Sequence, residues 1–185
     1  GYMDEKMIIG EILKENGSKA ATDWFYDYCV KNHYVKKSVL DKNLRFQASN
    51  GLIVTINKAK PEFRDPETAI KGNSVEEGFC KCVICRENEG YGARGKRNLR
   101  TVSLTLCSQS WFWQYSPYGY LKEHGIIVNS SHTPMRIDRD TFLLLMDFVD
   151  KYPHYFAGCN APLPGIGGIV LSHDHYQGGG EILPL

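Results

Sequence analysis

The sequence predicts an α+β fold, in which an antiparallel sheet carries packed helices and further short helices stand at the N-terminal end. The chain has 185 residues, of which 42% are hydrophobic and 12% aromatic, and these are enough for a substantial core. Asn50-Gly51 stands between two apolar runs, which is a strong signal for a β-hairpin. After Asp138, apolar residues recur at helical spacing. Both strands and helices are therefore expected.

Two short helices are predicted first. Met7–Glu15 has apolar residues at helical spacing, and Gly17 stands where a C-terminal cap belongs. A second helix is predicted over Lys19–Asn32. Residues 1–40 are therefore expected to form a helical segment, separate from a main domain over residues 41–185.

The strands of the main domain are predicted from alternating or apolar runs bounded by turn residues. In chain order, the first and second of these strands should form one hairpin, and the third and fourth should form another. The predicted strands are Leu44–Ser49, Leu52–Asn57, Thr101–Ser108, Trp111–Ser116, Glu123–Asn129, Tyr155–Gly158 and Gly168–Gln177. Polar loops are expected over Lys58–Asn73 and Glu87–Arg100.

One amphipathic helix is predicted between these strands. Asp138 can cap it, Arg139–Lys151 form it, and Pro153 lies just past its end. Its expected apolar stripe consists of Phe142, Leu145, Met146 and Val149.

Charge and hydropathy exclude some classes of partner. Lys and Arg number 22 against 21 Asp and Glu, so no nucleic-acid partner is expected. No apolar run approaches the roughly 20 residues that span a bilayer, so no membrane partner is expected. The first residues lack the order of a secretion signal, and a cytoplasmic protein is the expectation. In the basic loop, Arg94, Lys96, Arg97 and Arg100 could contact phosphate, although a solvated loop explains them at least as well.

The six cysteines favour a reduced chain with a metal site over a set of disulfides. Cys80, Cys82 and Cys85 stand within six residues, too close together to pair well with one another. The other three lie in apolar or aromatic stretches and are expected to be small buried hydrophobes: Cys29, Cys107 and Cys159.

Cys82-x-x-Cys85 has the spacing that lets two thiolates share one ion, and zinc normally takes two further ligands. His132, after a predicted strand, and His173 can supply them. Cys80 could replace Cys82, iron could replace zinc, and a cysteine cluster without metal is a further alternative. Only packing is expected of the other strand-associated histidines, His124 and His154.

His173, His175 and Gln177 follow one another at two-residue spacing. In an extended strand their side chains point to one face. Such a set suits phosphate chemistry, because an imidazole can attack phosphorus while an amide holds an oxygen without giving it a proton. A strand with ordinary exposed polar residues is the alternative.

Several motifs, in the same order, resemble galactose-1-phosphate uridylyltransferase, most closely its divergent bacterial branch. The resemblance runs from about Ala20 onward. That family belongs to the histidine-triad superfamily, whose fold is an antiparallel sheet with packed helices, so residues 41–185 are expected to be a histidine-triad-like domain. The matching segments are Trp111–Tyr118, Glu123–Asn129, His132–Met135, Pro153–Phe156, Gly158–Ala161 and Ser172–Gly179.

The resemblance implies a two-step uridylyl transfer in galactose metabolism. His175 would attack the α-phosphorus of UDP-glucose, and galactose 1-phosphate would then accept the uridylyl group. Gln177 stands where hydrolytic members of the superfamily carry a third histidine, and its amide would favour transfer. Asn160 and Ser172 would bind or orient phosphate, and His173 would be a ligand of a supporting zinc.

The resemblance also implies that the chain is a piece of a longer enzyme, the N-terminal half of the catalytic region, and that the full-length protein is a homodimer. Asp174 stands where the family has proline and should point away from the reacting face. Two rival functions remain: a histidine-triad nucleotide hydrolase or adenylyltransferase, which would release nucleoside monophosphate without a sugar phosphate, and a zinc-stabilised interaction module, which would form no nucleotide adduct.

Overall fold

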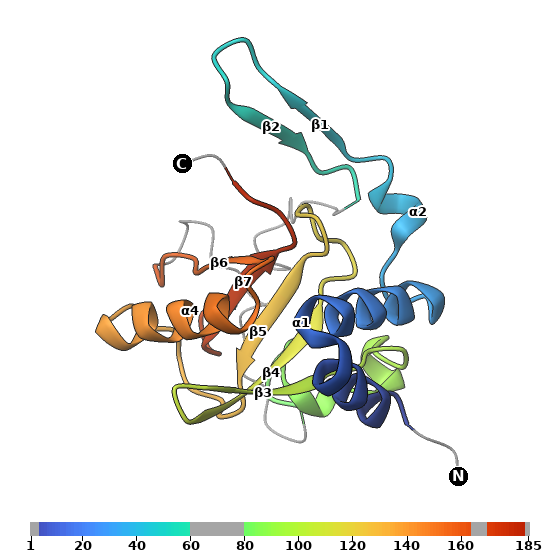
Figure 1. The fold of residues 1–185 in the computed structure, drawn as a ribbon, viewed down its shortest axis with the longest axis vertical. Helices are drawn as coiled ribbons and strands as arrows, with labels where there is room; N and C mark the ends of the chain where they lie inside the picture. Colours follow the sequence, from blue (N-terminus) through green and yellow to red (C-terminus); the bar gives the residue numbers. More distant parts are fainter. Residues whose placement is uncertain (1–3, 60–79, 164–169, 184–185) are drawn as a thin grey trace.

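A five-stranded antiparallel sheet lies at the centre of the computed structural model, which describes residues 4–59, 80–163 and 170–183 (Figure 1). The predicted α+β class is confirmed. The parts of the predicted loops and strand at residues 60–79 and 164–169 lie outside the described residues. The elements are α1 (Glu5–Lys31), α2 (Lys37–Leu40), β1 (Leu44–Gln47), β2 (Ile53–Ile56), η1 (Arg86–Asn88), η2 (Gly92–Arg94), β3 (Val102–Leu106), β4 (Gln109–Tyr115), β5 (Gly125–Asn129), α4 (Arg139–Lys151), β6 (Phe156–Gly158) and β7 (His175–Gly179).

The strand order is β3-β4-β5-β7-β6, so the last strand of the chain lies between two earlier ones. Its register pairs Gln177 with Ile126 of β5 on one side and with Gly158 of β6 on the other. Because alternate residues of a strand face opposite sides, His175 and Gln177 share one face of the sheet, and Tyr176 lies on the other.

The face that carries Tyr176 is covered by α1 and α4. Trp111, Trp113 and Ile127 pack there against Phe25 of α1 and Phe148 of α4, and all are fully buried or nearly so. Aromatic burial of this kind is the main apolar stabilisation of the fold, at about 25 cal/mol for each Å² removed from water.

Helix α1 contains both predicted N-terminal helices, joined across a kink. At the junction, Gly17 has φ +88° and ψ 177°, a conformation that glycine adopts without strain. Asp4 caps the helix by accepting a hydrogen bond from the Met7 backbone N–H. The second half packs on the sheet, and Ala21, Phe25 and Cys29 are buried there.

Helix α4 has the predicted bounds and the predicted cap, since Asp138 and Thr141 form a reciprocal capping box. The predicted apolar stripe is wrong in two positions: Phe142 and Met146 are 62% and 53% exposed. The buried face consists of Thr141, Leu144 and Phe148, flanked by the partly buried Leu145 and Val149.

Both predicted hairpins are present. The hairpin β1–β2 turns at Gly51, with φ +86°, and extends away from the main sheet (Figure 1). The hairpin β3–β4 turns at Cys107 and Ser108, both at positive φ, so that Cys107 is exposed and not buried as expected. Of the other two cysteines expected in the core, Cys29 is buried and Cys159 is half-buried.

The last strand is displaced from its predicted range, because β7 begins at His175 and continues to Gly179. The residues just before it form a different contact: the Asp174 backbone N–H donates to the Thr133 carbonyl at 2.7 Å, and the Asn129 N–H donates to the Asp174 carbonyl at 3.0 Å. His173 therefore lies just before the strand.

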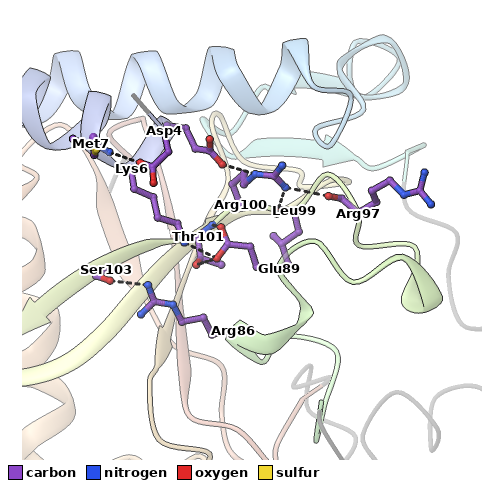
Figure 2. Close-up of polar contacts among 11 residues, drawn as sticks. Asp4, Lys6, Met7, Arg86, Glu89, Arg97, Leu99, Arg100, Thr101 and Ser103 are labelled. Atoms are coloured by element: carbon purple, nitrogen blue, oxygen red, sulfur yellow. Dashed lines mark hydrogen bonds and ion pairs between the residues drawn. The ribbon is translucent and has the colours of Figure 1, made fainter. Parts of the chain in front are cut away.

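The predicted loop before β3 contains η2 and part of η1 and is tied to α1 and β3 by polar contacts (Figure 2). Arg100 pairs with Glu5 of α1 at 2.5 Å, and Glu89 accepts from the hydroxyl of Thr101 at 2.9 Å. Arg86 donates to the Ser103 hydroxyl. Among the described residues, no helix has both the length and the apolar character needed to cross a membrane.

Candidate functional site

The sheet face that carries His175 and Gln177 is covered in part by the segment around the cysteines. Cys82 and Cys85 pack there against Phe112 of β4 and Val128 of β5. Val128 pairs with His175 and also with Phe112, so the cysteines lie over the row of residues that contains His175. The predicted metal cluster and the predicted catalytic pair therefore lie on one face.

The four predicted metal ligands meet at one point. The ligand atoms of Cys82, Cys85, His132 and His173 all lie within 4.8 Å of one another. The two sulfurs are 3.4 Å apart, and the nearest sulfur to nitrogen distances are 3.2 and 3.3 Å. Ligands of a tetrahedral zinc lie ~3.3 to 3.8 Å apart. This Cys2His2 cluster could therefore bind a metal ion.

Two groups outside the cluster hold it in place. The buried Asn88 side chain donates to the carbonyls of Cys82 and Cys85 at 2.8 and 2.9 Å, which fixes the turn between them. His173 has its Nε2 at 2.7 Å from the Asn129 carbonyl, which can only accept. Nε2 of His173 therefore carries the proton, and its Nδ1 turns a lone pair toward the sulfurs, as a metal ligand requires.

The cluster favours a thiolate at Cys85. The pKa of this thiol is lowered to about 3, first by the hydrogen bond with Cys82 and then, against the effect of burial, by the imidazoles of His173 and His132. A thiolate is the form that binds metal. Cys80 is buried nearby but is not in the cluster.

His175 is buried at the start of β7. Its Nδ1 lies 2.8 Å from the carbonyl oxygen of His173. A carbonyl only accepts, so Nδ1 carries the proton and Nε2 keeps its lone pair. Burial lowers the pKa of His175 below its ordinary value, which favours the neutral ring. The imidazole is therefore held as the tautomer in which Nε2 is a nucleophile.

Gln177 lies two residues further along β7 on the same face as His175, and both ends of its amide make hydrogen bonds. Nε2 donates to Asn160 Oδ1 at 3.2 Å, and Oε1 lies 2.8 Å from Nε2 of His124. The structure thus brings Asn160 to Gln177, as expected for residues of one site. The sequence predicts only a packing role for His124. Two-residue spacing from Ile126 places it on this face, but the sequence does not reveal which strand lies beside β5.

Ser172 and Asp174 flank His173. The Ser172 hydroxyl is buried without a hydrogen-bond partner among the described residues. Asp174 lies with Tyr176 along a separate cavity of about 700 Å³, and burial raises its pKa. Asp174 therefore faces away from His175, as predicted.

The basic loop residues have different surroundings. Arg100 is engaged by Glu5 and by backbone carbonyls (Figure 2), and Arg94 donates to the Cys80 carbonyl at 2.7 Å. Arg94 and Arg97 also line a cavity of about 490 Å³ together with Lys36 and Lys96. A phosphate contact by Arg94 or Arg97 stays a prediction.

The family model described as galactose-1-phosphate uridyl transferase, N-terminal domain, matches residues 5–134. The chain belongs to this family. The matched part contains Cys82, Cys85 and His132 of the cluster, whereas His173, His175 and Gln177 lie beyond it.

Relatives in the galactose-1-phosphate uridylyltransferase family align over nearly the whole chain. A protein of that name from Bifidobacterium longum subsp. longum is 59% identical over 99% of the chain, and one from Clostridium perfringens is 44% identical over 90%. A third, from Fusobacterium nucleatum, is 41% identical over 94% of the chain. The chain spans about a third of each relative, 35% of its length. No solved structure matches the chain.

Proposed function

We propose that this chain carries the nucleophile of a nucleotidyltransferase that moves a uridylyl group from UDP-glucose to galactose 1-phosphate, through a covalent uridylyl-histidine at His175. Membership of the family and the names of its relatives support the reaction class. The observation that carries the proposal is the 2.8 Å hydrogen bond from His175 Nδ1 to the His173 carbonyl, because it leaves Nε2 free to attack.

In the first step, Nε2 of His175 attacks the α-phosphorus of UDP-glucose. A nitrogen–phosphorus bond forms, the bond from the α-phosphorus to the bridging oxygen breaks, and glucose 1-phosphate leaves with the electron pair. The ring gains positive charge in this step. The Nδ1 hydrogen bond to the His173 carbonyl becomes stronger as the charge develops, and it therefore stabilises the intermediate.

In the second step, a phosphate oxygen of galactose 1-phosphate attacks the same phosphorus. The nitrogen–phosphorus bond breaks, and the electron pair returns to Nε2 of His175, which regenerates the neutral ring. UDP-galactose leaves. The pKa of His175, lowered by burial, favours this return because it disfavours a protonated ring.

Three polar side chains are proposed to hold the transferred group. The Gln177 amide donates a hydrogen bond to a phosphoryl oxygen and cannot release a proton, which favours transfer over hydrolysis. Asn160 orients that amide by accepting from its Nε2. The buried hydroxyl of Ser172 is the second donor, and its lack of a partner among the described residues fits a role in binding substrate.

The metal is proposed to be zinc, held by Cys82, Cys85, His132 and His173; iron also suits this donor set. When bound, it supplies a crosslink between the cysteine segment and the segment that leads into β7. The ring of His173 belongs to the cluster while its carbonyl holds His175. The cluster therefore positions the nucleophile without taking part in a bond change.

The remaining features of the proposal concern the whole protein. We expect a cytoplasmic homodimer, with no membrane or nucleic-acid partner. The hexose 1-phosphate preference depends on parts beyond this chain. The division at residue 41, with a histidine-triad-like domain over residues 41–185, stays a prediction, and α1 shares one core with the sheet.

Isotope exchange tests the proposal in the natural full-length polypeptide. Labelled glucose 1-phosphate should exchange into UDP-glucose without galactose 1-phosphate, because the uridylyl-histidine can react in reverse. His175→Ala should abolish the exchange, and His33→Asn, a change at an exposed histidine, should keep it. Exchange that survives in His175→Ala would refute the assigned nucleophile. Release of UMP without any sugar phosphate would instead favour the hydrolase.

A further inference from the structure

The imidazole of His124 lies beside Gln177 on the reacting face of the sheet. Ile126 pairs with Gln177, and His124 precedes Ile126 by two residues, so His124 is the diagonal cross-strand neighbour of Gln177. Its Nε2 is 2.8 Å from Gln177 Oε1, and the residue is 5% exposed. A hydrogen bond at this distance and burial holds its acceptor firmly.

This hydrogen bond determines which end of the Gln177 amide faces which partner. The amide oxygen only accepts, so His124 donates through Nε2–H. With the oxygen turned to His124, the NH2 end turns to Asn160, whose Oδ1 takes one of the two N–H bonds. The second N–H can donate to a phosphoryl oxygen. If the amide rotated by half a turn, it would present an acceptor to an anionic group.

His124 itself is tightly fixed. A Cβ at Gly119 would lie 2.3 Å from His124 Cβ and 2.6 Å from its Cγ, so the ring needs glycine at that position. Tyr120 packs edge-on against the ring, with centroids 5.1 Å apart. The His124 carbonyl accepts from the Ser116 N–H at 2.8 Å, which extends the pairing of β4 and β5. The ring thus has little freedom to follow a moving amide.

We propose that His124 is a positioning residue that holds the donor end of Gln177 toward the transferred phosphoryl group. This inference rests on the proposed uridylyl transfer. His124 acts through Gln177 and makes no contact with substrate in this account. Its loss should lower the rate of the first half-reaction at saturating UDP-glucose roughly 10- to 100-fold, less than the ~100- to 1,000-fold typical of removing a stabilising donor outright. The apparent KM should change little.

A double-mutant cycle in the natural full-length polypeptide tests the proposal. Single-turnover release of glucose 1-phosphate is measured for wild type, His124→Phe, Gln177→Ala and the double variant. His124→Phe should slow the reaction when Gln177 is present and have no further effect in Gln177→Ala. Equal slowing in both backgrounds would show a merely structural role, and no slowing at all would also overturn the proposal.

Two further variants control for folding. His154→Phe also removes an imidazole whose Nε2 makes a short side-chain hydrogen bond, to Thr22 at 2.7 Å, and it should react at the wild-type rate. His124→Gln places an N–H donor near the position of Nε2 and should recover at least part of the lost rate. Failure of this rescue in a folded, metal-loaded variant would count against positioning.

A spectroscopic readout separates this inference from the proposed function. The side-chain amide signal of Gln177, assigned by its loss in Gln177→Ala, should shift in His124→Phe and stay in place in His154→Phe. An unmoved signal would overturn the positioning role whatever the activity. Absence of glucose 1-phosphate release in wild type would refute the proposed function alone, and the amide signal would still decide the role of His124.

Discussion

At position 177 an amide stands on the same face of the sheet as His175, the proposed nucleophile. An amide donates hydrogen bonds at any physiological pH but does not deliver a proton to a leaving group or take one from water. Hydrogen bonds with His124 and Asn160 fix both of its ends. A histidine at this position would have the same reach toward phosphate and could act as an acid.

Gln177→His should therefore increase hydrolysis of UDP-glucose relative to transfer, because an imidazole can assist attack by water. The measurement is UMP release by the natural full-length polypeptide without galactose 1-phosphate. Gln47→His, on the projecting hairpin, is the control and should hydrolyse no faster than wild type. An unchanged ratio in Gln177→His would contradict the role given to the amide.

At the metal cluster, Cys85→Ser should remove most of the bound metal, since serine does not supply a thiolate. Cys80→Ser is a matched control, because Cys80 is buried in the same segment and lies outside the cluster. Metal content by elemental analysis is the measurement. Loss of metal in Cys80→Ser with retention in Cys85→Ser would assign the ligands differently.

The candidate site was predictable to the extent that it depends on local spacing. The spacing Cys82-x-x-Cys85 predicts two thiolate ligands of one metal ion, and two-residue spacing predicts that His175 and Gln177 lie on one face of a strand. His124 and Asn88 were not predictable in the same way. The role of His124 depends on the register of β5 against β7, and that of Asn88 on a turn geometry that only the folded loop defines.

Among the elements, helix α4 shows where a periodic pattern misleads. Two apolar stripes run along Arg139–Lys151, and the caps do not determine which one packs on the sheet. The structure buries Leu144 and Phe148 and exposes Phe142 and Met146. The rings of Trp113 and Phe148 pack together with their centroids 5.3 Å apart, and this contact fixes which face of the helix turns toward the sheet.

Phe148→Ala should lower the free energy of unfolding by about 3 to 5 kcal/mol, because it opens a cavity among buried aromatic rings. Phe142→Ala removes the same side chain from an exposed position on the same helix and should change it by less than about 0.5 kcal/mol. Denaturant titration measures both. Equal losses of unfolding free energy in the two variants would favour the apolar stripe predicted from the sequence, which contains Phe142.

Helix α1 is joined to the segment before β6 by a hydrogen bond of His154, a residue whose contribution to the free energy of unfolding depends on pH. His154 contacts Thr22 of α1, with Lys19 and Asp23 as the charged groups nearby. Burial, and then Lys19, lower the pKa of His154 below its ordinary 6.5. Below pH 6.5 the unfolded chain thus binds a proton that the folded chain resists binding.

The contribution of His154 to stability is therefore fully present above pH 6.5 and declines as the pH falls through the window below it. His154→Phe should lose less stability than wild type between neutral pH and about pH 5, because its ring does not titrate. Thermal unfolding across this range is the measurement. Parallel pH curves for the two proteins would contradict the shift.

In the molecule as a whole, three distant stretches of sequence meet at the site. Cys82 and Cys85 come from the segment before η1, His132 from the segment after β5, and His173 to Gln177 from the segment that forms β7. The insertion of β7 between β5 and β6 brings them together. The α+β class and most strands could be predicted from local patterns. This strand order depends on contacts between segments that are far apart in the sequence, and short patterns do not reveal such contacts.

A local contact gives the proposed covalent catalysis its physical basis: the carbonyl of His173 lies against Nδ1 of His175 while the ring of His173 joins the metal cluster. If that arrangement carries covalent catalysis, wild-type protein mixed with UDP-glucose should gain the mass of one uridylyl group. The adduct must be kept at alkaline pH, because phosphoramidates hydrolyse in acid.

Intact mass spectrometry of the natural full-length polypeptide after mixing with UDP-glucose is therefore the most direct test. We expect a uridylyl adduct that is absent in His175→Ala and that disappears from wild type when galactose 1-phosphate is added. An adduct that persists in His175→Ala, or UDP-galactose formation by wild type without any adduct, would refute covalent catalysis at His175.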